Sequence, residues 1–291
     1  LGRKIEKEKN RSVIEMWQWW RAHKMSQIII YIREKAGITK PMWAFTLTWE
    51  MGKQHGQDPL MFIDAGIDMN AAMYYSVPKD TYPMMINDWE AYLKRGKTSL
   101  VAGQCVDWNL LGRTYDPAGP AEHFIRQQHL VDKLLPVNPS LGLFWHDLTR
   151  AFLNTSGPYS SLEWGITGAA TFTYLRKKQG CFPFTVTWDA PDEVKLNVPF
   201  TVEINVKNTS KTGSNFIMKP MKIANLSMSE SADQTFYLAP GEIRTFNLNM
   251  QAARMDARKE NMQMIAFMIQ YGERKTQNRY FEYKYVKVEK Q

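Results

Sequence analysis

The chain has 291 residues, which is long enough for two domains. Apolar residues make up 44% and charged residues 23%, with 10 Trp, 13 Tyr and 14 Phe, so disorder over most of the chain is excluded. The net charge is +8, but Lys and Arg are interspersed with Asp and Glu and form no basic stripe, so we expect no nucleic-acid partner.

The sequence also argues against membrane spans and metal chemistry. The longest apolar runs, such as residues 28–32, fall far below the roughly 20 residues that cross a bilayer, so we expect no membrane span. Cys105, Cys181 and the histidines show no metal-ligand spacing, so we expect no metal site and no cofactor. No signal segment opens the chain, and we expect the native start to lie upstream or to have been removed.

The first 180 residues alternate helical and strand patterns. Ser12 with Glu15 predicts a capping box for a long helix that ends near Gly37. The run 42–49 is apolar, aromatic and β-branched, which predicts a strand buried on both faces. Glu50 lies at the C-terminal end of that strand.

The alternation then continues with a brief helix after Asp58. Further strands are predicted at 66–75, 99–108 and 141–145, and further helices at 84–95, 120–135 and 160–178. Four βα units with short loops predict a parallel sheet flanked by helices.

A different pattern begins near residue 180. Seven candidate strands separated by turns predict a β-sandwich, at 184–188, 194–206, 214–228, 234–238, 242–250, 262–271 and 279–288. Alternating Val202, Ile204 and Val206 predict one face in a core. We therefore predict one domain at 1–180 and a second at 181–291.

The stretch 58–75 carries an acidic residue, a short apolar helix, Gly-x-Asp, a buried strand and Met-x-Tyr, in this order. It resembles a barrel strand of glycoside hydrolases, and the helix 17–33 is similar to the helix before their fifth strand. Over residues 13–178, the resemblance implies the C-terminal half of a (β/α)8 barrel, strands 5–8. A seven-strand β-sandwich of immunoglobulin or fibronectin type would follow it.

A half barrel leaves two strand edges unpaired and lacks four strands. The resemblance therefore implies a partner, the missing N-terminal barrel half. Upstream sequence, a separate chain or a second copy of this chain would supply it.

The active sites of such barrels lie at the C-terminal ends of the strands. Glycoside hydrolysis uses two carboxyl groups about 5 to 9.5 Å apart, and Glu50 and Asp107 are the predicted catalytic pair. In many of these barrels the acid follows the fourth strand, which would leave Asp107 alone. The predicted substrate-binding residues combine aromatic rings with polar groups, as a sugar requires: Trp49, Tyr75, Trp108, Trp145, His146 and Asp147.

Each candidate also has a structural interpretation. Glu50 fits an ordinary loop carboxylate, Asp107 fits a turn cap, and Trp145 fits core packing. His146 next to Asp147 fits a hydrogen-bonded pair at the rim of the strands.

Two functions remain open at this point. The first is a secreted or surface glycoside hydrolase with a polysaccharide or glycan partner. The second is a non-catalytic surface, assembly or glycan-binding protein. An extracellular or cell-surface location is expected, and four Asn-x-Ser/Thr sequons are compatible with it, at Asn10, Asn154, Asn208 and Asn225.

Overall fold

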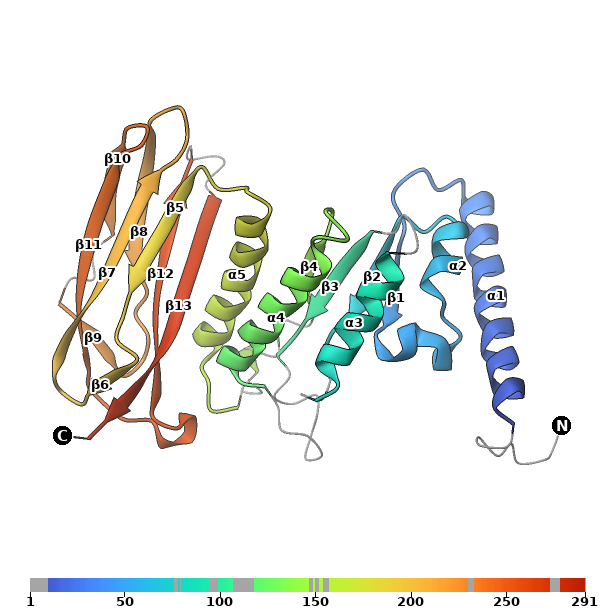
Figure 1. Cartoon of the computed structure of the whole chain (residues 1–291), viewed down its shortest axis with the longest axis horizontal. Helices are drawn as coiled ribbons and strands as arrows, with labels where there is room; N and C mark the ends of the chain where they lie inside the picture. The colour runs from blue at the N-terminus through green and yellow to red at the C-terminus, as the bar shows by residue number, and fades with distance from the viewer. Residues whose placement is uncertain are drawn as a thin grey trace. The chain divides into compact units, whose positions relative to one another are not determined.

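The chain divides into two compact units in a computed structural model (Figure 1). The structure describes residues 10–75, 78, 80–94, 99–106, 118–146, 149, 152–153, 157–229, 233–272 and 278–290, without the side chains of 49–51. The α/β unit comprises Leu1–Pro117 and His129–Leu148, and the sandwich unit comprises Ala118–Gln128 and Thr149–Gln291.

The α/β unit is built around a four-stranded parallel sheet with the order β1-β2-β3-β4. Its strands are β1 (Trp43–Leu47), β2 (Met69–Met73), β3 (Leu100–Gln104) and β4 (Gly142–Trp145). Its helices are α1 (Arg11–Ala36), η1 (Trp49–His55), α2 (Pro59–Asp64) and α3 (Tyr82–Leu93), and α4 (Pro120–Leu134) precedes β4 in the chain. The predicted alternation of helices and strands is confirmed.

Local signals explain several of the helix ends. The Asp58 side chain caps α2 by accepting hydrogen bonds from the backbone N–H groups of Leu60 and Met61. Gly37 ends α1 in the left-handed conformation that favours glycine. The predicted capping box at Ser12 is wrong, because α1 begins at Arg11 and its N-cap residue Asn10 makes no side-chain cap.

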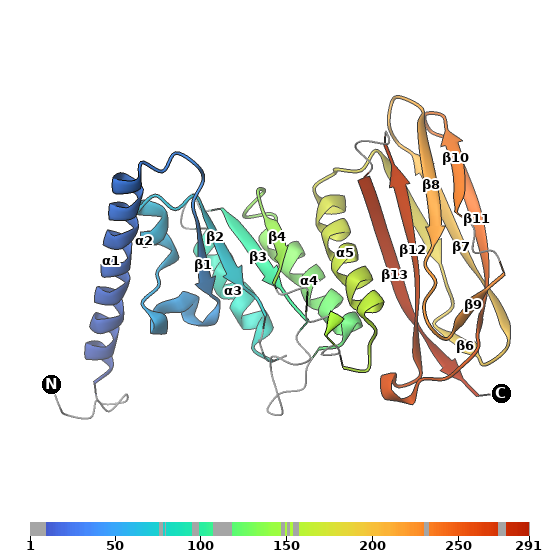
Figure 2. The same cartoon turned by 180° about the vertical axis from the view of Figure 1, so that it is seen from behind.

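In the described part of the chain, one face of this sheet is covered and the other is open. Right-handed crossovers between consecutive parallel strands place the connecting helices on the same side, and α3 lies over one face (Figure 1). On the covered face, Ala72, Leu100 and Ala102 are fully buried. In the opposite view the strands lie in front of α3 (Figure 2).

The expectation that the first strand is buried on both faces is wrong. Trp43 is 52% exposed and Phe45 is 54% exposed, although both are large apolar residues. They lie on the face opposite the connecting helices. The strand is therefore covered by a packed layer on one face only, although its sequence is apolar on both.

The predicted fold class is also corrected. The described part of the chain forms an open four-stranded sheet and no closed barrel, so it does not show half of a (β/α)8 barrel. The predicted seven strands of the second domain are nine in the structure, because each of the two longest predicted strands, 194–206 and 214–228, is divided into two.

The sandwich unit contains two antiparallel sheets with a shared core. One sheet has the order β10-β8-β12-β13-β6 and the other β5-β7-β11-β9, with only β6 paired parallel to its neighbour β13. The strands are β5 (Phe184–Asp189), β6 (Glu193–Lys195), β7 (Pro199–Asn208), β8 (Ser214–Pro220), β9 (Leu226–Met228), β10 (Gln234–Leu238), β11 (Ile243–Ala252), β12 (Met262–Tyr271) and β13 (Asn278–Glu289). Val202, Ile204 and Val206 are fully buried between the sheets, as their alternation predicts.

Helix α5 (Ser161–Lys178) packs against β13 within the sandwich unit. Ser160 and Glu163 form a capping box at its start. Ile166 and Ala170 of α5 join a second apolar cluster with Met264 and Tyr283 of the sheet. The helix therefore belongs to the core of this unit.

A buried ion pair fixes the start of α5 to the sandwich. The Lys259 ammonium lies 2.9 Å from both carboxylate oxygens of Glu163, and the Tyr285 hydroxyl donates to the same carboxylate at 3.0 Å. The side chains of Glu163 and Lys259 are 1% and 8% exposed. Burial and the charge of Glu163 raise the pKa of the Tyr285 hydroxyl.

None of the described helices is long and apolar enough to cross a membrane. Cys105 is buried, Cys181 is exposed, and both are free thiols.

Candidate functional site

The predicted site residues fall at the carboxyl edge of the parallel sheet, where the structure describes only some of them. Tyr75 follows β2, Trp145 ends β4 and His146 follows it. Trp49 and Glu50 lie in the 3-10 helix η1, but their side chains lie outside the described part, as do Asp107, Trp108 and Asp147. The catalytic and sugar-binding roles of all these residues stay predictions.

Two of the predicted residues meet at this edge. The rings of Tyr75 and His146 stack with centroids 4.6 Å apart and planes within 6°. The backbone N–H of His146 donates to the Gln104 carbonyl at 2.7 Å, which extends the pairing of β4 with β3 beyond Trp145. Both stacked residues are partly exposed, so they form a flat aromatic surface at the end of the sheet.

The neighbouring Tyr74 has a different role. It is 1% exposed, and its ring packs against Tyr82 and Trp89 of helix α3. Burial raises the pKa of its hydroxyl well above the ordinary tyrosine value, so it stays neutral. Tyr74 is therefore a packing residue, while Tyr75 faces the surface.

No group of three His, Cys, Asp or Glu among the described side chains is arranged to hold a metal ion.

The most extensive feature of the α/β unit is the open face of its sheet. The open face comprises Trp43, Phe45, Leu47, Met69, Ala71, Met73, Val101, Gly103, Gly142 and Phe144, as the strand register places them. It contains no charged or polar side chain. Trp43 and Phe45 expose about half of their surface, and Leu47, Met69, Met73 and Phe144 are partly exposed.

Two aromatic rings from non-adjacent strands meet on the open face. Strands β1 and β4 are not neighbours, and in a flat sheet they would lie about 14 Å apart. The rings of Phe45 and Phe144 nevertheless meet edge to face with centroids 5.6 Å apart. Gly103 permits this, because a Cβ atom there would lie 2.4 Å from the Phe144 ring.

The outer edge of β1 is closed by a side chain. The amide of Gln57 accepts a hydrogen bond from the Leu47 N–H at 2.9 Å and donates one to the Phe45 carbonyl at 3.1 Å. These are the groups that a further strand would use. Gly52 leaves room for this amide, since its own Cβ would lie 2.3 Å from Gln57 Oε1.

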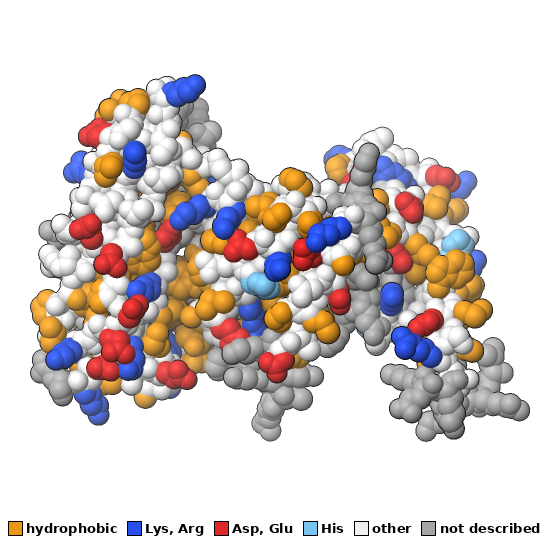
Figure 3. Space-filling model, viewed as in Figure 1, with side chains coloured by type: hydrophobic (Ala, Val, Ile, Leu, Met, Phe, Trp, Pro, Cys, Tyr) orange, Lys and Arg blue, Asp and Glu red, His pale blue; other side chains and the backbone are white. Residues whose placement is uncertain are grey.

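A second exposed apolar surface runs along α1. Trp17, Trp19 and Trp20 are 55%, 58% and 45% exposed, and Figure 3 shows apolar side chains gathered over this helix. Only Ala22 and Ser26 of α1 are buried. Lys24 lies among the tryptophans, 5.9 Å from the Trp20 ring, so this surface is charged as well as apolar.

The sequence analysis did not identify the open face as functional. Its signal was the double-sided apolar pattern of residues 42–49, which we interpreted as burial on both sides. That pattern also fits a strand whose second face is left uncovered by the described part of the chain, as the half-exposed rings of Trp43 and Phe45 indicate.

Comparisons with known proteins identify no family. No protein-family model matches the chain, and no curated protein matches it. It is similar to solved structures of alpha-2-macroglobulin, one from Escherichia coli in its native conformation (11% identity, TM-score 0.31) and one from Salmonella (13% identity, TM-score 0.31). A third, of the Escherichia coli protein from domain MG7 to the C-terminus, has 11% identity and a TM-score of 0.31.

Each match covers 37% of this chain and only 7%, 7% and 17% of the three macroglobulin chains, respectively. At this TM-score the likeness transfers neither fold nor function. The prediction of a glycoside hydrolase is nevertheless corrected. The described strands form an open sheet and no closed barrel, which removes the fold on which that prediction rested.

Proposed function

We propose that the protein is an assembly protein, and that two copies associate through the open face of the α/β unit. One observation carries the proposal: the aromatic residues Trp43 and Phe45 are half exposed on the uncovered face of an all-parallel sheet. All-parallel sheets have both faces covered almost without exception, because their strands are apolar on both sides. The open face therefore requires a second layer.

The chemistry of the open face favours a second copy as that layer. Chains with a net charge of +8 repel one another, but the open face lacks charge and permits close approach. A two-fold interface must be self-complementary. Methionine sulfur packs well against aromatic rings, and the open face supplies both, with Met69 beside Trp43 and Met73 beside Leu47.

The closed edge of β1 favours packing of faces over pairing of edges. Gln57 already occupies the hydrogen-bonding groups of Phe45 and Leu47 that an added strand would need. Burying the exposed part of each aromatic ring contributes roughly 1 kcal/mol or more. Both copies contribute these rings to the interface, so the dimer gains this contribution from each copy.

Sedimentation velocity over a concentration series tests the proposal. We expect a monomer–dimer equilibrium for the natural chain and a monomer for the Trp43→Ser/Phe45→Ser double variant. Trp19→Ser is the matched control, because Trp19 has similar exposure on α1 and should leave the dimer intact. A natural chain that stays monomeric, or a folded double variant that still dimerises, contradicts the proposal.

The extracellular or cell-surface location belongs to the same proposal. It is supported by Asn10 and Asn225, two sequon residues that are partly exposed. Surface biotinylation of the cells that produce the protein, together with immunoblotting of their medium, tests it, and a protein found only inside the cells contradicts it.

A further inference from the structure

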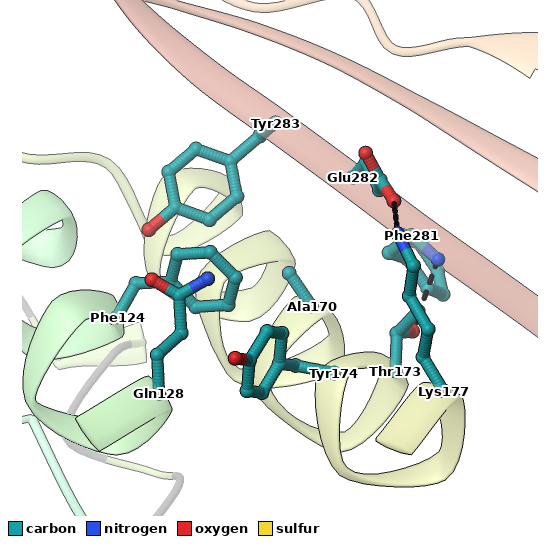
Figure 4. Close-up of a pocket in the computed structure, with 9 residues that line it drawn as sticks. All are labelled: Phe124, Gln128, Ala170, Thr173, Tyr174, Lys177, Phe281, Glu282 and Tyr283. Atoms are coloured by element: carbon teal, nitrogen blue, oxygen red, sulfur yellow. Dashed lines mark hydrogen bonds and ion pairs between the residues drawn. The ribbon is translucent and has the colours of Figure 1, made fainter. Parts of the chain in front are cut away.

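A small cavity of about 140 Å³ lies within the sandwich unit, between the first turns of α4, helix α5 and strand β13 (Figure 4). It is independent of the open face. Helix α4 contributes Phe124 and Gln128, and α5 contributes Ala170 and Tyr174.

The walls of the cavity are aromatic. The Phe124 ring lies edge to face with Tyr174 at 6.2 Å and 5.2 Å from the Tyr283 ring. Ala170, which is 2% exposed, adds a small apolar surface between them. Edge-to-face geometry leaves ring faces and edges available to one more aromatic group.

Most polar groups at the cavity are already hydrogen-bonded. The Tyr283 hydroxyl donates to the Pro120 carbonyl at 3.0 Å, and Thr173 Oγ1 accepts from the Phe281 N–H at 3.1 Å. Lys177 Nζ lies 3.2 Å from Glu282 Oε1. Because these groups are already paired, they are not the polar contacts on which ligand binding would depend.

Gln128 is different. Its side chain is partly buried and reaches into the space beside Phe124 (Figure 4). It has no hydrogen-bond partner among the described side chains and backbone groups. Its amide therefore offers a donor NH2 group and an acceptor oxygen at the cavity.

We propose that this cavity binds a single phenol-type ring, with its hydroxyl on the Gln128 amide and its ring against Phe124 and Tyr174. The volume agrees with one ring, because an apolar cavity of about 150 Å³ accommodates benzene. The free amide selects a ring with a hydroxyl group over a plain hydrocarbon ring, since burying the amide without a partner is unfavourable.

Calorimetric titration with p-cresol and with toluene tests the proposal. We expect p-cresol to bind about fivefold more tightly than toluene, as one neutral hydrogen bond provides. Gln128→Leu should remove this preference. Ala170→Leu should fill the cavity and abolish binding of both probes, while its circular dichroism spectrum stays native.

Three results would overturn the proposal. They are no binding of p-cresol up to its solubility limit, equal binding of p-cresol and toluene to the natural chain, or unchanged binding in a folded Ala170→Leu variant. The Ile125→Gln variant serves as a control on the exposed side of α4 and should bind p-cresol as the natural chain does.

Discussion

The rings of Phe45 and Phe144 meet at 5.6 Å although their strands are separated by two others. The contact passes over the small residues Ala71 and Gly103. This contact buries Ala71 and leaves Phe45 about half exposed on the open face.

The glycine beneath this contact gives the first prediction. Gly103→Val places a side chain where the Phe144 ring lies, since even a Cβ there would lie 2.4 Å from the ring. We expect a loss of stability of about 1 to 3 kcal/mol from overpacking. Urea unfolding measures it. The matched variant Gly165→Ala should change stability by less, because no atom lies within 4 Å of an added Cβ.

The edge closure by Gln57 gives a second prediction. Gln57→Leu removes two hydrogen bonds to β1 and leaves the Leu47 N–H and Phe45 carbonyl without them, which should cost about 1 to 3 kcal/mol. It also opens an edge strand, so light scattering should detect aggregation on heating. Gln54→Leu is the control, because that side chain is exposed and, unlike Gln57, is not hydrogen-bonded to β1 in the described structure. Equal behaviour of the two variants would show that Gln57 does not protect the edge.

The ion pair in the sandwich unit gives a third prediction. Lys259→Met leaves the Glu163 carboxylate buried without its cation, and we expect a loss of about 3 to 5 kcal/mol. Lys287→Met removes exposed ion pairs with Glu193 and Glu289 and should cost much less, because water screens exposed pairs. Thermal unfolding of the two variants compares them directly. Similar losses would mean that the buried pair contributes no more than a surface pair.

Acid stability gives a fourth prediction. His123 is 2% exposed, and burial lowers its pKa from 6.5 to about 3. As the pH falls, the His123 imidazole therefore binds a proton near pH 6.5 in the unfolded chain but only near pH 3 in the folded chain. Stability is present in full above pH 6.5 and falls as the pH drops through this window, by up to about 1.4 kcal/mol per pH unit.

A His123→Phe variant should lose that part of the pH dependence. Unfolding free energies at several pH values between 6.5 and 3 check it, with His23→Asn on the exposed side of α1 as control. A slope that His123→Phe leaves unchanged would assign the acid sensitivity to other groups.

Glycosylation gives a fifth prediction. The Asn208 amide is fully buried and donates to the carbonyls of Thr212 and Leu238, so it cannot carry a glycan in the folded protein. Asn225 is partly exposed in a turn. In a secretory host, mass spectrometry should find glycan at Asn225 and none at Asn208. Occupancy of Asn208 in folded protein would contradict the position of its side chain.

The order of helices and strands was predictable because it depends on local patterns. Capping at Asp58, the stop at Gly37 and the alternation of Val202, Ile204 and Val206 are each signalled within a few residues. The common edge shared by Tyr75 and His146 follows from the parallel order of the strands.

Other features depend on contacts that no local pattern encodes. The Glu163–Lys259 pair joins residues 96 positions apart. The exposure of Trp43 and Phe45 was mispredicted for a related reason. An apolar strand sequence indicates that both faces of the strand favour burial, but it does not indicate whether the chain itself covers both. The resemblance to a barrel then led to a function that the open sheet does not support.

Hydroxyl-radical footprinting of the natural chain at low and at high concentration tests the central claim most directly. If the open face forms the interface between two copies, oxidation of Trp43 and Phe45 falls at high concentration while that of the equally exposed Trp19 stays constant. Oxidation of Trp43 and Phe45 that is the same at both concentrations, or that falls only together with Trp19, would contradict the account.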